Sequence, residues 1–277
     1  MKSVRELLTS FRYLFVVLVA VIAVVQLLRV SGANIYLPAA VGIADPEPAS
    51  YWEAGRDGRP KPFFLSGTSQ WLAFKKSVLS DRSVLDRVER ETGIRARLIV
   101  SELVAEQMRY HFSSKGRFER LTGVKNVLMN PKIGISLGPM GLKVSTAKKI
   151  ESHALNESTP FYPGPGLVRL ISTTGAVNSE EELFLRFTAV DHYYSYLYAA
   201  MYSREIIAQW NRYGYDISER PEIIATLYNI GFSNSRPNSE PKVGGAAVVS
   251  FDGRRYSFGR LAYEFYYSSE LLEEFQR

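Results

Sequence analysis

Ile94–Tyr110, IRARLIVSELVAEQMRY, is the most informative stretch of this 277-residue chain. Apolar residues recur through it at helical spacing, and Glu102 and Glu106 lie one turn apart on the same helix. An apolar helix face disfavours the ionised form of a carboxyl, which suits that carboxyl to act as a general acid near neutral pH. The same pattern also fits two surface glutamates that pair with Arg97 or Arg109.

The helical pattern extends on both sides of this stretch and predicts a mainly α domain over residues 70–277. Gly93 is a candidate C-terminal cap, and Asp252-Gly253 is a candidate hairpin turn within Val243–Tyr256. The further helices that we expect are Trp71–Leu79, Val84–Val88, Thr146–Ser152 capped by Ser145, a run from Asn178 to Tyr213 with a break near Phe187–Thr188, Pro221–Tyr228 and Phe258–Phe275.

The N-terminal residues contain the longest apolar run. Tyr13–Leu28, YLFVVLVAVIAVVQLL, has Gln26 as its only strongly polar residue and approaches the ~20 residues that span a bilayer. The cations before it predict a cytoplasmic N-terminus at residues 1–12, a transmembrane anchor at 13–30 and a domain outside the cytoplasm. A cleaved signal peptide, with Ser31 and Ala33 at the cleavage site, fits the same residues.

Residues 31–69 are rich in proline and glycine. Such a composition predicts a linker between the anchor and the domain, with a short ordered stretch near Phe63–Leu65. The expected location is therefore the inner (cytoplasmic) membrane, crossed once, with the domain on the periplasmic side.

Composition argues against several kinds of site and partner. The chain has no cysteine, which excludes disulfides, zinc-thiolate sites and cysteine nucleophiles. His111, His153 and His192 lack the spacing of metal ligands. Half of the net charge of +6 lies in residues 1–30, and elsewhere cations and acids are interleaved, unlike a nucleic-acid-binding face. We expect no metal, no other cofactor and no nucleic-acid partner.

Two further segments carry candidate binding residues. Ile135–Ile150, ISLGPMGLKVSTAKKI, has glycines that allow close approach of a ligand to the backbone, followed by a helix start. Glu222–Phe232, EIIATLYNIGF, places a Tyr-Asn pair at the end of an apolar helix, just before a glycine.

In this order, the three segments resemble the lysozyme-like superfamily, and within it the lytic transglycosylases and related muramidases. The resemblance rests on a glutamate after an apolar helical run, on Ser136-Leu137-Gly138 leading to Thr146-Ala147, and on Tyr228-Asn229-Ile230-Gly231. It covers roughly residues 94–272. It implies a mainly α (α+β) lysozyme-like fold and an enzyme that acts on the glycan strands of peptidoglycan.

Carried over by position, the resemblance makes Glu106 the catalytic acid. Ser136 and Gly138 would line the cleft, and Tyr228 and Asn229 would contact the sugar and position the acid. Many relatives have a glutamine where this chain has Gly141, and residues 112–131 form an apparent insertion.

The implied reaction needs one carboxyl. Glu106 would protonate the glycosidic oxygen between N-acetylmuramic acid and N-acetylglucosamine and then take the proton of the C6 hydroxyl as a 1,6-anhydro ring closes. A hydrolase would need a water and a second carboxylate, for which Glu102 is the candidate. The alternative is a protein that keeps the fold as a catalytically weak or inactive glycan-binding or scaffold component of an envelope complex.

Overall fold

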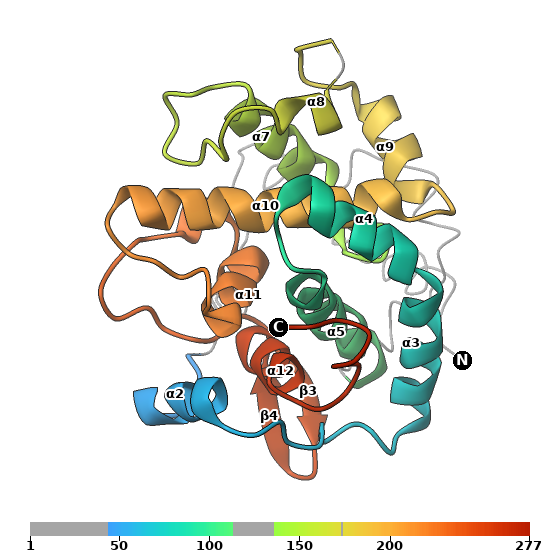
Figure 1. Ribbon diagram of the computed structural model, residues 1–277, viewed down its shortest axis with the longest axis vertical. Coiled ribbons are helices and arrows are strands. Elements are labelled where there is room, and N and C mark those ends of the chain that lie inside the picture. Colours follow the sequence, from blue (N-terminus) through green and yellow to red (C-terminus); the bar gives the residue numbers. More distant parts are fainter. Residues whose placement is uncertain (1–43, 113–135, 173) are drawn as a thin grey trace, which may run out of the picture. The chain divides into compact units, whose positions relative to one another are not determined.

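Helix α5 (Ala96–Phe112) occupies the middle of the computed structural model, which describes residues 44–112, 136–172 and 174–277 (Figure 1). The helix starts where Glu89 Oε2 accepts a hydrogen bond of 2.8 Å from the amide of Ala96. Every residue from 96 to 106 is buried, because α5 is surrounded by α3, α4, α10, α11, α12 and strand β3. A helix covered on all sides must be apolar or must pair its polar groups internally.

The described residues are mainly helical, which confirms that part of the sequence prediction. The other described helices are α2 (Ala49–Asp57), α3 (Ser69–Ser80), α4 (Arg82–Thr92), α7 (Val144–Ala154), α8 (Val168–Ile171), α9 (Glu180–Thr188), α10 (Tyr193–Arg212), α11 (Pro221–Ile230) and α12 (Phe258–Tyr266), with a short 3₁₀ turn at Phe232–Asn234. The described strands form two antiparallel pairs, β1 (Ser136–Leu137) with β2 (Leu142–Lys143) and β3 (Ala247–Phe251) with β4 (Arg254–Ser257). No helix in the described part of the chain is long and apolar enough to cross a membrane, and the predicted anchor lies outside that part.

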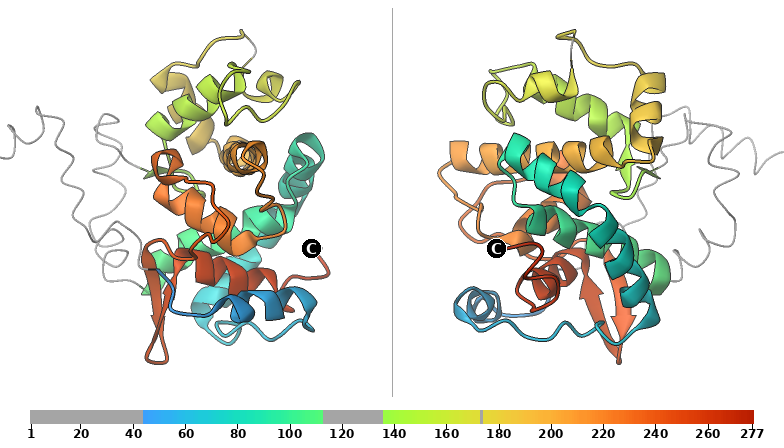
Figure 2. Two further views of the ribbon diagram at one scale, coloured as in Figure 1. Left: turned by 90° about the vertical axis from the view of Figure 1, so that its left-hand side faces the viewer. Right: turned by 45° about the vertical axis from the view of Figure 1, so that its right-hand side comes forward.

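Helix α10 separates two groups of elements (Figure 1, Figure 2). Helices α7, α8 and α9 pack together on one side of it, while α4, α5 and α11 contact its other side. Of the 20 residues in α10, 14 are buried, because both groups of elements pack against this helix. Its tyrosines therefore pack mainly in the core.

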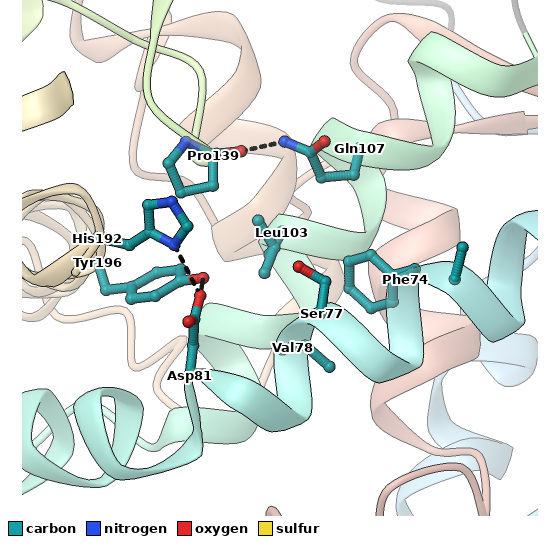
Figure 3. A pocket seen from close by; sticks show the side chains of 10 residues that line it. Phe74, Ser77, Val78, Asp81, Leu103, Gln107, Pro139, His192 and Tyr196 are labelled. Carbon is teal, nitrogen blue, oxygen red and sulfur yellow. Dashed lines mark hydrogen bonds and ion pairs between the residues drawn. The ribbon is translucent and has the colours of Figure 1, made fainter. Parts of the chain in front are cut away.

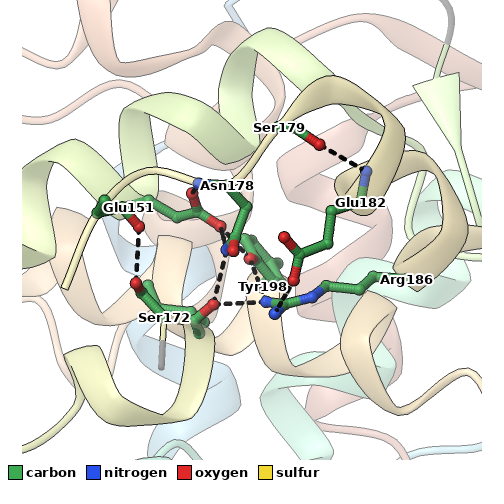
Figure 4. A network of polar contacts seen from close by, with 9 residues as sticks. Glu151, Ser172, Asn178, Ser179, Glu182, Arg186 and Tyr198 are labelled. Carbon is green, nitrogen blue, oxygen red and sulfur yellow. Dashed lines mark hydrogen bonds and ion pairs between the residues drawn. The ribbon is translucent and has the colours of Figure 1, made fainter. Parts of the chain in front are cut away.

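A buried carboxylate holds the α7–α9 group to α10 (Figure 4). Glu151 of α7 accepts hydrogen bonds from the backbone amide of Asn178 at 2.6 Å and from its side-chain amide at 2.5 Å. The hydroxyl of Tyr198 on α10 donates to the same carboxylate. Since charge-assisted bonds to a buried carboxylate are strong, this cluster fixes the segment before α9 against both helices.

The guanidinium of Arg97 joins α5 to the end of α12 and to the segment that follows it. Its side chain is fully buried, and each of its five N–H groups faces a backbone carbonyl at 2.7–3.1 Å. Burial lowers the pKa of Arg97 to about 10, so the group stays charged at neutral pH. The acceptors are the carbonyls of Phe265, Tyr266, Ser268, Glu270 and Phe275.

Most helix limits agree with the sequence, and three predictions are wrong. Helix α7 begins at Val144 with Lys143 before it, so Ser145 is not its cap. Helix α12 ends at Tyr266 rather than Phe275, because the carbonyls beyond that point face Arg97. Gly93 (φ +72°) and the 252–253 turn behave as expected.

The third correction concerns the predicted linker, whose residues 44–69 belong to the folded unit. Residues 49–57 contain no proline and form α2. The Trp52 ring meets the Tyr263 ring edge-on at 5.0 Å between centroids, and the hydroxyl of Tyr263 donates to the carbonyl of Tyr51. Phe63 and Leu65 are also buried, so burial of aromatic side chains outweighs the local proline content here.

We expect Arg97→Met to destabilise the protein by about 3–5 kcal/mol, because it leaves five buried carbonyls without their donor. Arg82→Met is the matched control, since Arg82 is half exposed and its nearest acid, Asp86, is 3.9 Å away; it should cost less than about 0.5 kcal/mol. Urea unfolding followed by tryptophan fluorescence measures both. Equal costs for the two variants would contradict the structural role given to Arg97.

Candidate active site

Glu106 lies near the C-terminal end of α5, with its side chain almost entirely buried. Arg109, three residues further along the helix, donates from Nη2 to Oε1 of Glu106 at 2.5 Å. The other side of the carboxyl is covered by Gly141, where an added Cβ would lie 2.0 Å from Oε1. Glu106 is thus a buried, ion-paired carboxyl pressed against a backbone turn.

That turn, Gly138–Gly141, joins β1 to β2 and requires glycine at both ends. Gly138 has φ +66° and Gly141 has φ +64°, a conformation that other residues adopt at a cost. A Cβ on Gly138 would lie 2.6 Å from Oγ of Ser195 on α10. Because a side chain at 141 would meet Glu106, the position has no room for the glutamine of the resembled family in this arrangement.

Side chains from three helices hold the turn in place. Gln107 of α5 donates to the carbonyl of Pro139. Tyr228 of α11 donates to the carbonyl of Met140 at 2.8 Å, and the amide of Met140 lies 3.4 Å from Oγ of Ser195. The structure therefore brings Glu106, Gly138 and Tyr228 to one place from segments far apart in the sequence.

Two other predicted site residues are placed differently. Asn229 is turned to the segment before β3, where its Oδ1 accepts a hydrogen bond of 2.8 Å from the amide of Ala246. Ser136 pairs through its backbone with Lys143 in the β1–β2 ladder. The predicted sugar contacts of Ser136, Gly138, Tyr228 and Asn229 stay predictions, and the apparent insertion falls almost wholly on residues outside the described ranges.

Glu102 is fully buried one turn before Glu106. Its Oε1 accepts a hydrogen bond of 2.7 Å from Oγ of Ser203, and its Oε2 has no hydrogen-bond partner among the described residues. Burial raises the pKa of Glu102 to about 8. A carboxyl with no exposed surface does not reach a substrate, which disfavours Glu102 as the water-activating second carboxylate of a hydrolase.

A pocket of about 240 Å³ lies beside the same turn (Figure 3). Pro139 of the turn and Gln107 of α5 are among the residues that line it. At its edge, Asp81 accepts a hydrogen bond from the hydroxyl of Tyr196 at 2.6 Å and lies 2.8 Å from Nδ1 of His192. Sequence reasoning missed this cluster, because Asp81 and His192 are 111 positions apart.

Glu205 of α10 is another fully buried carboxyl that the sequence analysis did not single out. Its Oε2 lies 2.9 Å from Nδ1 of His153, and its Oε1 has no hydrogen-bond partner in the described part of the chain. Burial raises the pKa of Glu205 and lowers that of His153 to about 4. Burial therefore disfavours the charged form of both groups. No three acids or histidines of the described residues come together as metal ligands.

Comparison with family models, with curated proteins and with solved structures finds no match for this chain. The resemblance to the lysozyme-like superfamily therefore rests on the sequence motifs alone.

Gly141→Ala should destabilise the protein by about 3–5 kcal/mol, because the new Cβ adds a clash with Glu106 to the strain of a left-handed backbone. Gly214→Ala is the matched control: Gly214 has φ +83° with nothing within 4 Å of an added Cβ. That variant should cost about 1–2 kcal/mol. Urea unfolding of both proteins is the measurement, and a similar loss in each would show that the carboxyl does not lie against residue 141.

Glu102→Gln should change how stability depends on pH. The pKa of Glu102 is raised from 4.5 to about 8 on folding, so its contribution is complete below pH 4.5 and is lost as pH rises to about 8, by up to ~1.4 kcal/mol per pH unit. Glutamine does not titrate, so the stability of the variant relative to the native protein should improve steadily from pH 5 to 8. Urea unfolding across that range measures the difference, and parallel curves would rule out a protonated Glu102.

Proposed function

We propose that the protein is a membrane-anchored lytic transglycosylase that cleaves peptidoglycan between N-acetylmuramic acid and N-acetylglucosamine. The observation that carries the proposal is the meeting of the three motif segments: the Gly138–Gly141 turn lies against the Glu106 carboxyl and is held by Tyr228. These segments carry the family resemblance, and they lie far apart in the sequence, so local contacts do not bring them together. A lysozyme-like domain attached to the inner membrane and facing the periplasm completes the proposal, with the anchor at residues 13–30.

In the proposed reaction Glu106 works alone as acid and base. It protonates the glycosidic oxygen, and the acetamido group of the substrate stabilises the developing positive charge at the sugar carbon. The ionised Glu106 then removes the proton of the C6 hydroxyl, whose oxygen closes the 1,6-anhydro ring. The full burial of Glu102 favours this route over hydrolysis, which normally needs a second carboxylate ~5–9.5 Å away that can reach a water.

Arg109 has a defined part in this scheme. Its ion pair stabilises the charged form of Glu106, whereas the first step requires the protonated form. The proposed reaction therefore requires the guanidinium to leave Oε1 when substrate binds.

One observation favours the alternative, a glycan-binding or scaffold protein of an envelope complex. The Glu106 carboxyl is covered on one side by Arg109 and on the other by Gly141, so little of it is exposed. A protein that only binds glycan does not need an accessible carboxyl at Glu106.

Digestion of purified sacculi by the full-length protein in detergent separates these functions. We expect anhydro-ended muropeptides, with release reduced at least ~100-fold by Glu106→Gln because general acid catalysis supplies about that factor or more. Glu205→Gln is the control, since Glu205 is equally buried but belongs to the α7–α10 contact. Mass spectrometry of the products and a sacculus pull-down are the two readouts.

Each outcome has one meaning. Anhydro ends that depend on Glu106 support the transglycosylase, and reducing ends would replace it by a hydrolase. Sacculus binding without release, the same in the native protein and in Glu106→Gln, would reject the enzyme in favour of the binding role.

A further inference from the structure

The pocket of about 240 Å³ beside the Gly138–Gly141 turn combines an apolar wall with a few polar side chains (Figure 3). Phe74 and Val78 of α3 and Leu103 of α5 form the apolar wall. This make-up is typical of binding sites for small molecules, in which a few polar groups set the orientation of the ligand. The volume lies below the ~300–1,000 Å³ of sites for drug-sized molecules, so a ligand that fits this pocket is small.

Asp81 brings a carboxylate to the pocket that its neighbours satisfy on one oxygen only. The hydroxyl of Tyr196 donates to Oδ2 at 2.6 Å, and Nδ1 of His192 lies 2.8 Å from the same oxygen. The other oxygen, Oδ1, has no hydrogen-bond partner among the described residues, and the side chain keeps 15% of its surface exposed. Because a carboxylate accepts several hydrogen bonds, Oδ1 is available to a donor in the pocket.

His192 is held next to this carboxylate in an unusual backbone conformation. Its φ of +55° lies in the left-handed region, which residues other than glycine adopt at a cost. Since a carboxylate only accepts hydrogen bonds, the ring donates from Nδ1 to Asp81, and in the uncharged ring Nε2 is left as an acceptor. The contact with Asp81 therefore presents the pocket with a second acceptor in a fixed ring.

The charge of the lining indicates the kind of ligand. Among the described residues that line the pocket there is no lysine or arginine, and Asp81 is the only carboxylate. Ser77 and Gln107 add a hydroxyl and an amide to the lining. Phe74 and Tyr196 add aromatic rings, whose faces attract organic cations. The lining thus favours a positively charged donor and disfavours an anion.

We propose that this pocket binds a small organic ammonium ion, whose charged group pairs with Oδ1 of Asp81 while its apolar part lies against the apolar wall. A hydrogen bond between a charged donor and a carboxylate is about twice as strong as one between neutral groups. A neutral or anionic molecule of similar shape lacks that bond. The binding of this ligand does not depend on the proposed function of Glu106.

The same contacts also join two parts of the fold. Asp81 lies between α3 and α4, while His192 and Tyr196 lie at the start of α10. A contact that serves only this purpose needs no accessible carboxylate oxygen and gives no selectivity among ligands. Selective binding is therefore the property that distinguishes a ligand site from a structural contact.

The histidine rings provide a probe inside the site. The chain has three histidines, so the full-length protein with ¹³C in its histidine rings gives few NMR signals in micelles, and His192→Asn identifies the signal of His192. Asparagine is chosen because it tolerates the left-handed backbone better than most residues. Benzylamine, benzyl alcohol and benzoate, which share a ring and differ in charge, are titrated at one neutral pH.

We expect benzylamine, which is protonated at neutral pH, to shift the His192 signal saturably. Benzyl alcohol should bind at least ~10-fold more weakly, because it offers no charged donor, and benzoate should not bind. The His153 signal should not move, since His153 belongs to the separate contact with Glu205.

Two variants with matched controls test the carboxylate and the pocket. Asp81→Asn should weaken benzylamine binding at least ~10-fold, whereas Asp86→Asn, which removes an exposed acid outside the lining, should leave it unchanged. Ser77→Lys places an ammonium group of the protein itself at the pocket and should abolish binding. Ser80→Lys, on the same helix but outside the lining, should not. Both serines are exposed, so the two lysine variants are expected to fold.

Three results would overturn the proposal. The first is the absence of a saturable shift of the His192 signal with benzylamine, or an equal shift of the His153 signal, which would show a general effect. The second is equal affinity for benzylamine and benzyl alcohol, which would show that the pocket does not select charge. The third is unchanged binding in a folded Asp81→Asn protein; if that variant does not fold, unchanged binding in Ser77→Lys has the same meaning.

Discussion

The position of α5 depends on a buried arginine surrounded by backbone carbonyls. Arg97 uses all five of its N–H groups on the segment from residue 265 to 275, which a lysine with three donors and a shorter reach does not reproduce. Once Arg97 is fixed, the rise of a helix places Glu106 about 13 Å further along the axis. One interaction at the start of α5 therefore decides where the acid at its other end meets the Gly138–Gly141 turn.

The proposed function requires the Glu106 carboxyl to be both fixed in position and accessible, and these two requirements conflict. Burial and the close turn hold the Glu106 carboxyl in one place, as the proposed catalysis requires, yet they leave little of it exposed to the proposed substrate. Arg109 covers Oε1 through the ion pair, and Gly141 permits the backbone to lie where a glutamine side chain would not fit. The neutral Glu102 beneath them keeps a second negative charge away from the ion pair.

Local patterns predicted the helices well and the long-range polar contacts poorly. Gly93, Pro221 and the Asp252-Gly253 turn mark their elements because each acts through its own backbone, which a sequence displays directly. The burial of Glu102 was visible as a carboxyl in an apolar run, but its partner Ser203 was not. Helix α2 and the Asp81–His192 contact depend on residues more than 100 positions away, so no local rule predicts them.

The same distances along the chain bear on how the protein folds. The bonds of Arg97 join residues 168 to 178 positions apart, and Tyr228 meets Met140 across 88 positions. Closing such long loops costs entropy before any contact forms, so chains dominated by distant contacts fold slowly. Arg97 and Tyr228 gain these partners only when segments distant in the sequence meet. The arrangement around Glu106 therefore exists only in a chain whose long loops have closed.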